Sequence, residues 1–406
     1  MTTFGNARVA TLAGPARPRV GAELQELSIV DQGSFGVEAG KFVAPSQTSE
    51  VIDLGGRLVL PGFVDAHTHL VFGGCRSAEF RMRCAGASYE EIAASGGGIR
   101  STVAATRACS ESELIESGRR HASWMLSNGT TTAEAKSGYG LNLESELAIL
   151  HAIHAVGEQT LLRTVPTFLG MHAVPAEFAS ADAYTDYVIN SILPQAARLA
   201  AYADAFVERG YFDQTQVRRY ARAAKDLGMN LRLHVDQLTS GGGAELAAEL
   251  GATTADHLEQ TGPEGIAALK MAGVIPVLLP ASVHCLGKKK YPDARAMIDA
   301  GLPVVLATDF NPGSSPTPSL PFVMNLACTQ MGMSPAEAIV ACTVNAACSL
   351  GLGDTVGSIE LGKSADFVVF DAEDPAEIPY WAGAPIVHKV YARGSLAFSQ
   401  RLEVTR

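Results

Sequence analysis

Eight short apolar runs, separated by longer stretches with helical spacing, constrain the fold of this 406-residue chain more than any other feature. The intervening stretches, such as 144–156 and 334–350, carry apolar residues three and four positions apart. Regular alternation of this kind is typical of consecutive βα units around a parallel sheet. Eight units predict an α/β fold with a closed (β/α)8 barrel of the TIM type. The strand-like runs are 60–66, 130–136, 163–170, 203–208, 231–236, 253–257, 274–280 and 303–309.

The two ends of the chain lack this alternation. Residues 1–57 hold short segments of β character broken by Gly and Pro, and residues 357–371 form two strand-like runs around a Gly-Lys turn. A barrel of this type needs about 250 residues, so the chain has room for one additional small domain. We therefore expect the barrel over 58–355 and a small β-sandwich domain assembled from 1–57 and 356–406.

Charge and cysteine usage restrict the class of protein. The formal net charge is -11, and the run Lys288–Lys290, which we interpret as a solvated loop, is the only cluster of basic residues, so we expect no nucleic-acid partner. Seven cysteines without a CxxC pair favour reduced thiols. With no apolar run of about 18 residues, the sequence predicts a soluble cytoplasmic protein that does not bind membranes.

Polar residues close most of the strand-like runs. In barrels of this type the chemistry lies at the carboxyl ends of the strands, which makes these positions the first candidates for a site. His67 and His69 stand two apart after the first run, so an extended backbone projects both from one face. The other candidates are Lys136, His172, Glu208, His234, His257 and Asp309.

Four of these candidates predict one metal site. A catalytic divalent ion takes about three protein ligands and keeps a position open for water, and imidazoles with a carboxylate suit both zinc and iron. We predict that His67, His69, His234 and Asp309 bind a single ion. A carbamylated Lys136 bridging two metals is the alternative, but its place on the second strand favours structural roles for Lys136 and Glu208. Asp65 is interpreted as a partner that orients a ligand and lies outside the site.

These residues resemble the amidohydrolase superfamily, whose members carry HxH after the first barrel strand, His after the fifth and sixth, and Asp after the eighth. Within it the chain resembles the imidazolonepropionases over the whole barrel, and GSIELGKSADFVVFD resembles the C-terminal strands of the superfamily. The matching motifs are HTHLVFGGCR (67–76), GASYEEIAASGGGI (86–99), KSGYGLNLESE (136–146), TFLGMHAVP (167–175), HVDQL (234–238), ADHLE (255–259) and ATDFNPGSSP (307–316).

The resemblance implies hydrolysis of the cyclic amide 4-imidazolone-5-propanoate to N-formimino-L-glutamate, in histidine degradation, by water activated on zinc or iron. It implies that Asp309 carries the proton of that water and that His257 polarises the carbonyl group or steadies the oxyanion. Gln237 stands where some relatives have Glu, and an amide accepts no proton. Proton transfer then rests on Asp309 and His257.

Arg76 carries the prediction about the substrate, because a guanidinium grips a carboxylate with two parallel hydrogen bonds. A propionate tail needs such a clamp, so we expect a small-molecule substrate with a carboxylate. Gly96–Gly98 is either a flexible loop over the site or a turn, and the role of His284 after the seventh strand stays open. The other expected substrate contacts are Tyr139, His172, Gln237, Asn311, Gly313 and Ser314, with Tyr89 as a weaker candidate.

Two other functions remain open. A deaminase of a purine or pyrimidine ring uses the same metal ligands, but a neutral base needs no clamp such as Arg76. A non-catalytic assembly protein with this fold is free to lose its ligand positions, and here none is lost. Barrels of this kind are often homodimers, and no sequence feature fixes the number of subunits.

Overall fold

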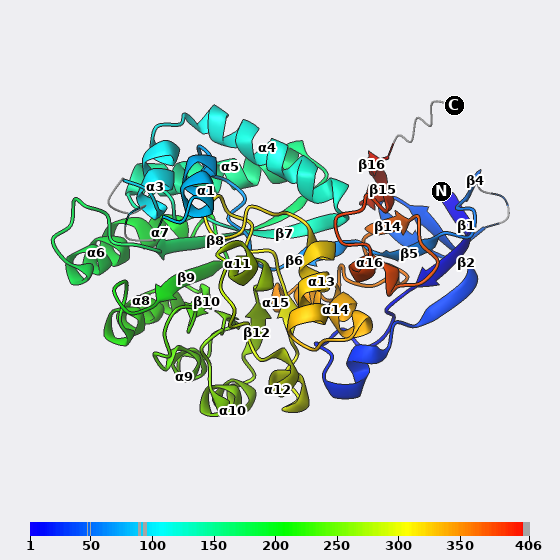
Figure 1. The fold of residues 1–406 in the computed structure, drawn as a ribbon. Coiled ribbons are helices and arrows are strands. Elements are labelled where there is room, and N and C mark those ends of the chain that lie inside the picture. The colour runs from blue at the N-terminus through cyan, green and yellow to red at the C-terminus, as the bar shows by residue number, and fades with distance from the viewer. Residues whose placement is uncertain (47, 49, 88–90, 92–95, 401–406) are drawn as a thin grey trace.

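The computed structural model describes residues 1–46, 48, 50–87, 91 and 96–400. A parallel eight-stranded sheet runs in the order β13-β12-β11-β10-β9-β8-β7-β6, with helices along its outside (Figure 1). A parallel bridge between Thr68 and Phe310 joins the last strand to the first, which confirms the predicted barrel. The strands are β6 (Phe63–Asp65), β7 (Thr130–Lys136), β8 (Arg163–Met171), β9 (Tyr202–Val207), β10 (Asn230–Val235), β11 (Thr254–His257), β12 (Ile275–Leu278) and β13 (Val305–Leu306).

The first predicted strand, 60–66, is wrong as a single element. It is divided at Gly62 into β5 (Leu58–Pro61), which belongs to a second sheet, and β6, which belongs to the barrel. A Cβ atom on Gly62 would lie 2.1 Å from Thr131 Oγ1, so only glycine allows the chain to pass this close to β7. One continuous apolar run therefore serves two sheets.

The second sheet combines both termini, which confirms the expected small β domain (Figure 1). Its core is aromatic: the rings of Phe367 and Tyr391 stack with centroids 4.5 Å apart, and Phe4 meets Phe367 edge-on at 5.0 Å. The strand order is β16-β15-β14-β5-β1-β2-β3, and β4 pairs with β1. The added strands are β1 (Thr2–Ala10), β2 (Ile29–Glu38), β3 (Lys41–Val43), β4 (Glu50–Asp53), β14 (Phe367–Phe370), β15 (Val387–Ala392) and β16 (Ser395–Ser399).

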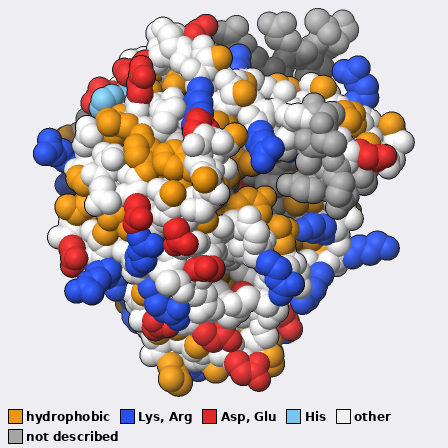
Figure 2. All heavy atoms as spheres, turned by 90° about the vertical axis from the view of Figure 1, so that its left-hand side faces the viewer, with side chains coloured by type: hydrophobic (Ala, Val, Ile, Leu, Met, Phe, Trp, Pro, Cys, Tyr) orange, Lys and Arg blue, Asp and Glu red, His pale blue; other side chains and the backbone are white. Residues whose placement is uncertain are grey.

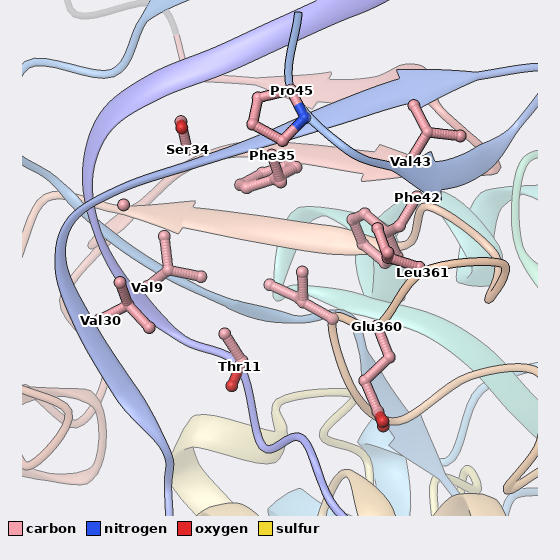
Figure 3. Close-up of a pocket in the computed structure, with 12 residues that line it drawn as sticks. Val9, Thr11, Val30, Ser34, Phe35, Phe42, Val43, Pro45, Glu360 and Leu361 are labelled. Carbon is pink, nitrogen blue, oxygen red and sulfur yellow. The ribbon is translucent and has the colours of Figure 1, made fainter.

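A cavity of about 180 Å³ opens on this second sheet (Figure 3). Val9, Val30 and Phe35 from the paired strands β1 and β2 line it, together with Glu360 and Leu361. Every lining residue lies in the terminal segments of the chain, so this cavity does not involve the histidines of the barrel.

The predicted helix 334–350 is also wrong as one element, because Thr343 leaves the helical conformation with φ -131° and ψ -92°. Its hydroxyl group donates to Ile339 O in the preceding turn, which is typical of a bend. None of the described helices is both long and apolar enough to cross a membrane. The helices are α1 (Ser77–Cys84), α3 (Ile99–Arg107), α4 (Glu111–Ser127), α5 (Leu143–Gln159), α6 (Ala181–Tyr187), α7 (Leu193–Ala196), α8 (Gln214–Asp226), α9 (Gly243–Glu249), α10 (Pro263–Ala272), α11 (Pro280–Cys285), α12 (Ala294–Asp299), α13 (Leu320–Gln330), α14 (Pro335–Ala341), α15 (Val344–Ser349) and α16 (Glu377–Tyr380), with short η1 (Gly21–Gln25) and η2 (Val188–Ile192).

Candidate metal centre and substrate site

The segment after β6 is fixed on both sides by backbone hydrogen bonds. The amide of Asp309 donates to His67 O at 3.0 Å, and the amide of His69 donates to Phe310 O at 2.9 Å. On the other side, the amide of Lys136 donates to Thr68 O at 2.9 Å. The segment is therefore extended between β7 and β13, so alternate side chains share one face.

The structure brings the four predicted metal ligands together with His257. Ligand atoms of His67, His69 and His234 lie within 4.8 Å of one another, and so do those of His67, His257 and Asp309. The Nε2 atoms of His67 and His69 each lie 3.6 Å from Asp309 Oδ1. All five side chains are buried. A single ion among them is therefore close to every predicted ligand.

Unpartnered ring nitrogens give an independent test of fit to a metal. Within the described part of the chain, His67 Nε2 and His234 Nε2 are buried and lack a hydrogen-bond partner; His69 Nδ1 is also unpartnered, but His69 faces Asp309 through Nε2. Such groups are rare unless an ion or water satisfies them. Burial lowers the pKa of all three histidines well below the ordinary value, which keeps them neutral. Neutral imidazole is the form that binds a cation, so these residues fit a divalent ion.

Carboxylates behind two of the histidines set their orientation. His67 Nδ1 lies 2.6 Å from Asp256 Oδ2, and His234 Nδ1 lies 3.1 Å from Asp204 Oδ1. Carboxylate partners of this kind fix the tautomer that points Nε2 into a metal site. Asp204 and Asp256 were missed in the sequence, although an acidic residue inside an apolar strand was the signal for them.

Lys136 and Glu208 also close strand-like runs, but they lie outside the histidine cluster. Lys136 Nζ donates to Glu134 Oε1 at 2.7 Å and to Asp204 Oδ2 at 2.8 Å. Burial lowers the pKa of Lys136, but the attraction of Asp204 and Glu134 outweighs burial and raises it above the ordinary value. A protonated amine has no lone pair with which to form a carbamate. Glu208 accepts hydrogen bonds from the backbone of Leu238 and Thr239, and so anchors the segment after β10.

Asp65 lies behind the other side of the site. Its carboxylate accepts hydrogen bonds from the backbone amide of Thr308 at 3.1 Å and from the Thr308 hydroxyl at 2.6 Å. Burial raises the pKa of Asp65 to about 7. Asp65 therefore positions the residue before Asp309 rather than a ligand imidazole, which corrects the interpretation from the sequence.

Asp309 and His257 have backbone conformations that L-residues rarely adopt, with φ values of 53° and 84°. Such conformations cluster at functional sites, where the surroundings hold them. Burial raises the pKa of Asp309 to about 6, against the opposing effect of His257. Burial lowers the pKa of His257, but Glu259, whose Oε1 lies 3.4 Å from His257 Nδ1, outweighs it and raises the pKa overall. A carboxyl group and an imidazole whose pKa values are both raised thus lie together.

Ser282, at the start of α11, is a further residue near the site that the sequence did not indicate. It is completely buried, and its hydroxyl group makes no hydrogen bond to a described residue, but it lies close enough to Asp309 to oppose the rise in the pKa of that carboxyl group. His284, two positions later, is exposed and contacts Phe322 edge-on with ring centroids 5.4 Å apart. The segment after the seventh strand thus faces the site through a serine, and its histidine faces away.

Arg76 is held from two sides. Its Nε and Nη2 atoms donate to Glu79 Oε2 at 2.8 and 2.6 Å. A Cβ atom on Gly313 would lie 2.0 Å from Arg76 Nη1, so the guanidinium rests directly on the glycine backbone. Glu79 Oε1 also accepts from the amide of Gly98, the residue before α3, at 3.1 Å. One carboxylate therefore positions both the predicted clamp and the glycine segment 96–98.

Tyr139 and His172 lie against the metal cluster. The ring of His172 stacks on His69 with centroids 5.2 Å apart and an interplanar angle of 18°, and Tyr139 lies 5.4 Å from His69. Burial lowers the pKa of His172 to about 4. Its Nδ1 atom lies 3.0 Å from Gly138 O. Both residues are thus placed to contact a molecule next to the histidines.

Asn311 and Ser314 form a closed turn after β13. The Asn311 side-chain oxygen accepts from the amides of Gly313 and Ser314, both at 2.8 Å, and its nitrogen donates to Asp309 O and to Ser314 Oγ. Ser314 Oγ also donates to Asp309 Oδ2 at 3.1 Å. The Asn311 amide is therefore engaged within the turn, whereas Ser314 touches the cluster directly.

Gln237 is partly exposed, and its amide makes no hydrogen bond to any described residue. Tyr89 lies outside the described residues. Gly98 has φ 79°, which explains why glycine precedes α3. A role of Gly96–Gly98 as a lid stays a prediction.

A pocket of about 720 Å³ borders the candidate substrate contacts. Its wall includes Gly98, whose amide donates to Glu79. It also includes Leu141, two residues after Tyr139, and Ala173, the residue after His172. Its lining comes from α3 and the segments after β8 and β9, on the side that faces the viewer in Figure 2. Acidic and basic side chains are interspersed over that face.

Comparison with known proteins gives a consistent result. Residues 58–397 match the Amidohydrolase family. Imidazolonepropionase of Solibacter usitatus is 51% identical over 404 residues, which cover 96% of this chain and 97% of the relative. Imidazolonepropionase of Rubrobacter xylanophilus is 49% identical, with 95% of this chain and 94% of the relative covered.

Solved structures share the fold at low sequence identity. The 5-methylcytosine deaminase of Klebsiella pneumoniae superposes with a TM-score of 0.72 at 17% identity, covering 100% of this chain and 99% of that chain. An adenosine deaminase of Xanthomonas campestris with bound zinc gives a TM-score of 0.68 at 20% identity, covering 100% and 94%. At these identities the likeness concerns the fold alone.

Proposed function

The chain belongs to the amidohydrolase family and, within it, to the imidazolonepropionases, and on this premise we propose how its site opens a cyclic amide. The reaction is the hydrolysis of 4-imidazolone-5-propanoate to N-formimino-L-glutamate in histidine degradation. The observation that carries the proposal is the position of Arg76 on Gly313, four residues after Asp309 of the metal cluster. A carboxylate bound at Arg76 thus places its ring near the histidines.

The proposed ligands of one divalent ion, zinc or iron, are His67, His69, His234 and Asp309. When bound, such an ion lowers the pKa of a coordinated water molecule toward about 7 and so supplies hydroxide at neutral pH. Asp204 and Asp256 hold the ligand rings in place through the Nδ1 atoms of His234 and His67. The preference for imidazole and carboxylate does not separate the two metals.

Proton transfer is assigned to Asp309 and His257. Asp309, whose pKa burial raises to about 6, takes a proton from the attacking water and delivers it to the ring nitrogen as the amide C–N bond breaks. His257, whose pKa Glu259 raises, donates a hydrogen bond to the carbonyl oxygen as negative charge develops there. Gln237 has a free amide and binds the substrate by hydrogen bonds alone.

The remaining substrate contacts follow from the same placement. Arg76 presents the edge of its guanidinium that Glu79 leaves free to the propanoate carboxylate. Tyr139 and His172 enclose the ring beside His69, and Ser314 faces it from the turn after Asp309. Asn311 and Gly313 act through the turn. Asn311 closes it by hydrogen bonds, and Gly313, which has no side chain, leaves room for Arg76.

A ring deaminase is the second candidate, because the deaminases that share the fold show that it supports such reactions. Arg76 argues against it, since a neutral base offers no carboxylate to a guanidinium. The small-molecule substrate, the cytoplasmic location and a homodimer are part of the proposal. The seven free cysteines agree with a reducing compartment.

The test follows the ultraviolet absorbance of 4-imidazolone-5-propanoate with protein of measured metal content. We expect rapid loss of substrate with the wild type and at least a thousandfold lower rate for His69→Ala. We expect Arg76→Lys to raise KM more than it lowers kcat, because a point charge replaces a bidentate clamp. Absence of turnover by the fully metal-loaded wild type would show that the substrate assignment is wrong. Aminated rings would then be screened as substrates.

A further inference from the structure

Five charged side chains fill the interior of the barrel beneath the histidine cluster. They come from strands that are not all neighbours in the sheet, so their contacts cross the barrel. Each is completely buried. Burial of a charge is costly unless the charge is paired, which makes every contact in this group important. The five residues are Glu134, Lys136, Asp204, Arg232 and Asp256.

Lys136 connects the parts of this group that reach the metal site. Its ammonium group lies 2.8 Å from Asp204 Oδ2, and both oxygens of Asp204 face His234 Nδ1, Oδ2 at 3.0 Å and Oδ1 at 3.1 Å. The ammonium group also lies 3.6 Å from Asp256 Oδ2, the same oxygen that lies 2.6 Å from His67 Nδ1. One cation therefore faces both carboxylates that orient predicted metal ligands.

Electrostatics explains why this position needs a cation. Three carboxylates and two cations give the buried group a net charge of about -1, and loss of Lys136 makes it about -2. Arg232 does not replace Lys136 at Asp204. Its Nη1 and Nη2 atoms donate to Ser349 O and Ala66 O, and its ion pairs are with Glu134 at 3.8 Å and Asp256 at 4.0 Å. Without Lys136, no cation pairs with Asp204, and nothing then holds its carboxylate against His234 Nδ1.

We propose that Lys136 is a positioning residue for the metal centre, acting on His234 through Asp204 and on His67 through Asp256. The inference rests on the proposed metal site and deepens it. The competing interpretation is that Lys136 only stabilises the barrel. The two interpretations differ in one quantity, the metal affinity of protein that remains folded.

The experiment measures zinc affinity by chelator competition on protein whose fold is checked by circular dichroism. We expect Lys136→Met to weaken zinc binding about 10- to 100-fold, the usual effect of losing a partner behind a ligand. The matched control is Arg163→Met, which removes an ion pair to Asp366 at 3.4 Å between the barrel and the terminal sheet. It should lower the unfolding temperature and leave zinc affinity unchanged.

Two further variants keep the test decisive. Asp204→Asn retains Lys136 and breaks the link to His234, so it should also weaken zinc binding if Lys136→Met does not fold. Lys136→Met combined with Asp204→Asn should weaken zinc binding by less than the product of the two single effects, because both changes act on His234 through the same contact. A wild type that binds neither zinc nor iron(II) overturns the metal site itself. Wild-type affinity in both single variants overturns the inference about Lys136 alone.

Discussion

At the residue scale, Gly313 matters because it has no side chain and Arg76 occupies the space where one would lie. Alanine there would place Cβ 2.0 Å from Arg76 Nη1, a separation that real contacts never show. The guanidinium would then have to leave its position above the turn. Asp309 and His257, the proposed catalytic groups, would keep their own contacts.

We therefore expect Gly313→Ala to raise KM at least tenfold with a smaller effect on kcat, because binding of the carboxylate is weakened in the ground and transition states alike. Steady-state kinetics measure both constants. The matched control is Arg76→Ala combined with Gly313→Ala, which should be no worse than Arg76→Ala alone because the two changes remove the same contact. An additive loss in the double variant would contradict this account.

Residues of the site differ in how far sequence reasoning reached them. His67, His69, His234 and Asp309 were predictable because each closes an apolar run, and position along a strand is visible in the sequence. Lys136 was found, but its partner Asp204 lies 68 positions away. Contacts across the inside of a barrel depend on strand register, which the pattern of one chain does not contain.

At the element scale, the junction of β5 and β6 shows how one apolar run serves two sheets. The amide of Gly62 donates to Asp366 O at 2.8 Å, just before β14, while Phe63 begins the barrel. Thr131 of β7 fills the space that a side chain at position 62 would need.

Gly62→Ala should therefore destabilise the protein by about 1–3 kcal/mol, the usual effect of overpacking a core. Urea unfolding followed by circular dichroism measures the change in the free energy of unfolding. Thr131→Ala removes the two closest atoms, so it should restore part of the loss when combined with Gly62→Ala. Thr131→Ala by itself is the control, and equal stability of the single and double Gly62 variants would contradict the steric explanation.

The elements themselves were largely predictable, because strand and helix periods differ and eight units alternate regularly. The two errors share a cause. The run 60–66 and the stretch 334–350 each have a continuous apolar pattern, yet the chain changes direction at Gly62 and at Thr343. Those breaks depend on close contacts and hydrogen bonds that an apolar pattern does not show.

At the scale of the whole molecule, one face of the terminal sheet shares the hydrophobic core of the barrel, while its other face has the separate aromatic core of Phe4, Phe367 and Tyr391. Leu60 of β5 and Phe370 of β14 belong to the same buried cluster as Met125 of α4 and Ile149 of α5. The continuous run through β5 and β6 and the buried cluster that contains Leu60 and Phe370 join the two regions, so we expect the barrel and the terminal sheet to unfold together.

Metal removal tests this coupling. Saturation at about 100 times Kd stabilises the native state by about 2.7 kcal/mol, which slows globally exchanging amides about 100-fold. We expect chelation to speed hydrogen exchange of the slowest amides equally in β11, beside the site, and in β14 of the terminal sheet. Mass spectrometry with and without chelator measures both. Faster exchange confined to β11 would show that the two regions open independently.

The pairing of β5 with β14 also affects the order in which the parts of the site become available during protein synthesis. Leu58 of β5 pairs with Phe370 of β14, so the segment that leads to His67 and His69 leaves the ribosome long before its partner is made. Asp309, too, is added late. The nascent chain thus carries His67 and His69 for most of translation without the neighbours that orient them, so the proposed metal site is incomplete until Asp309 has been added.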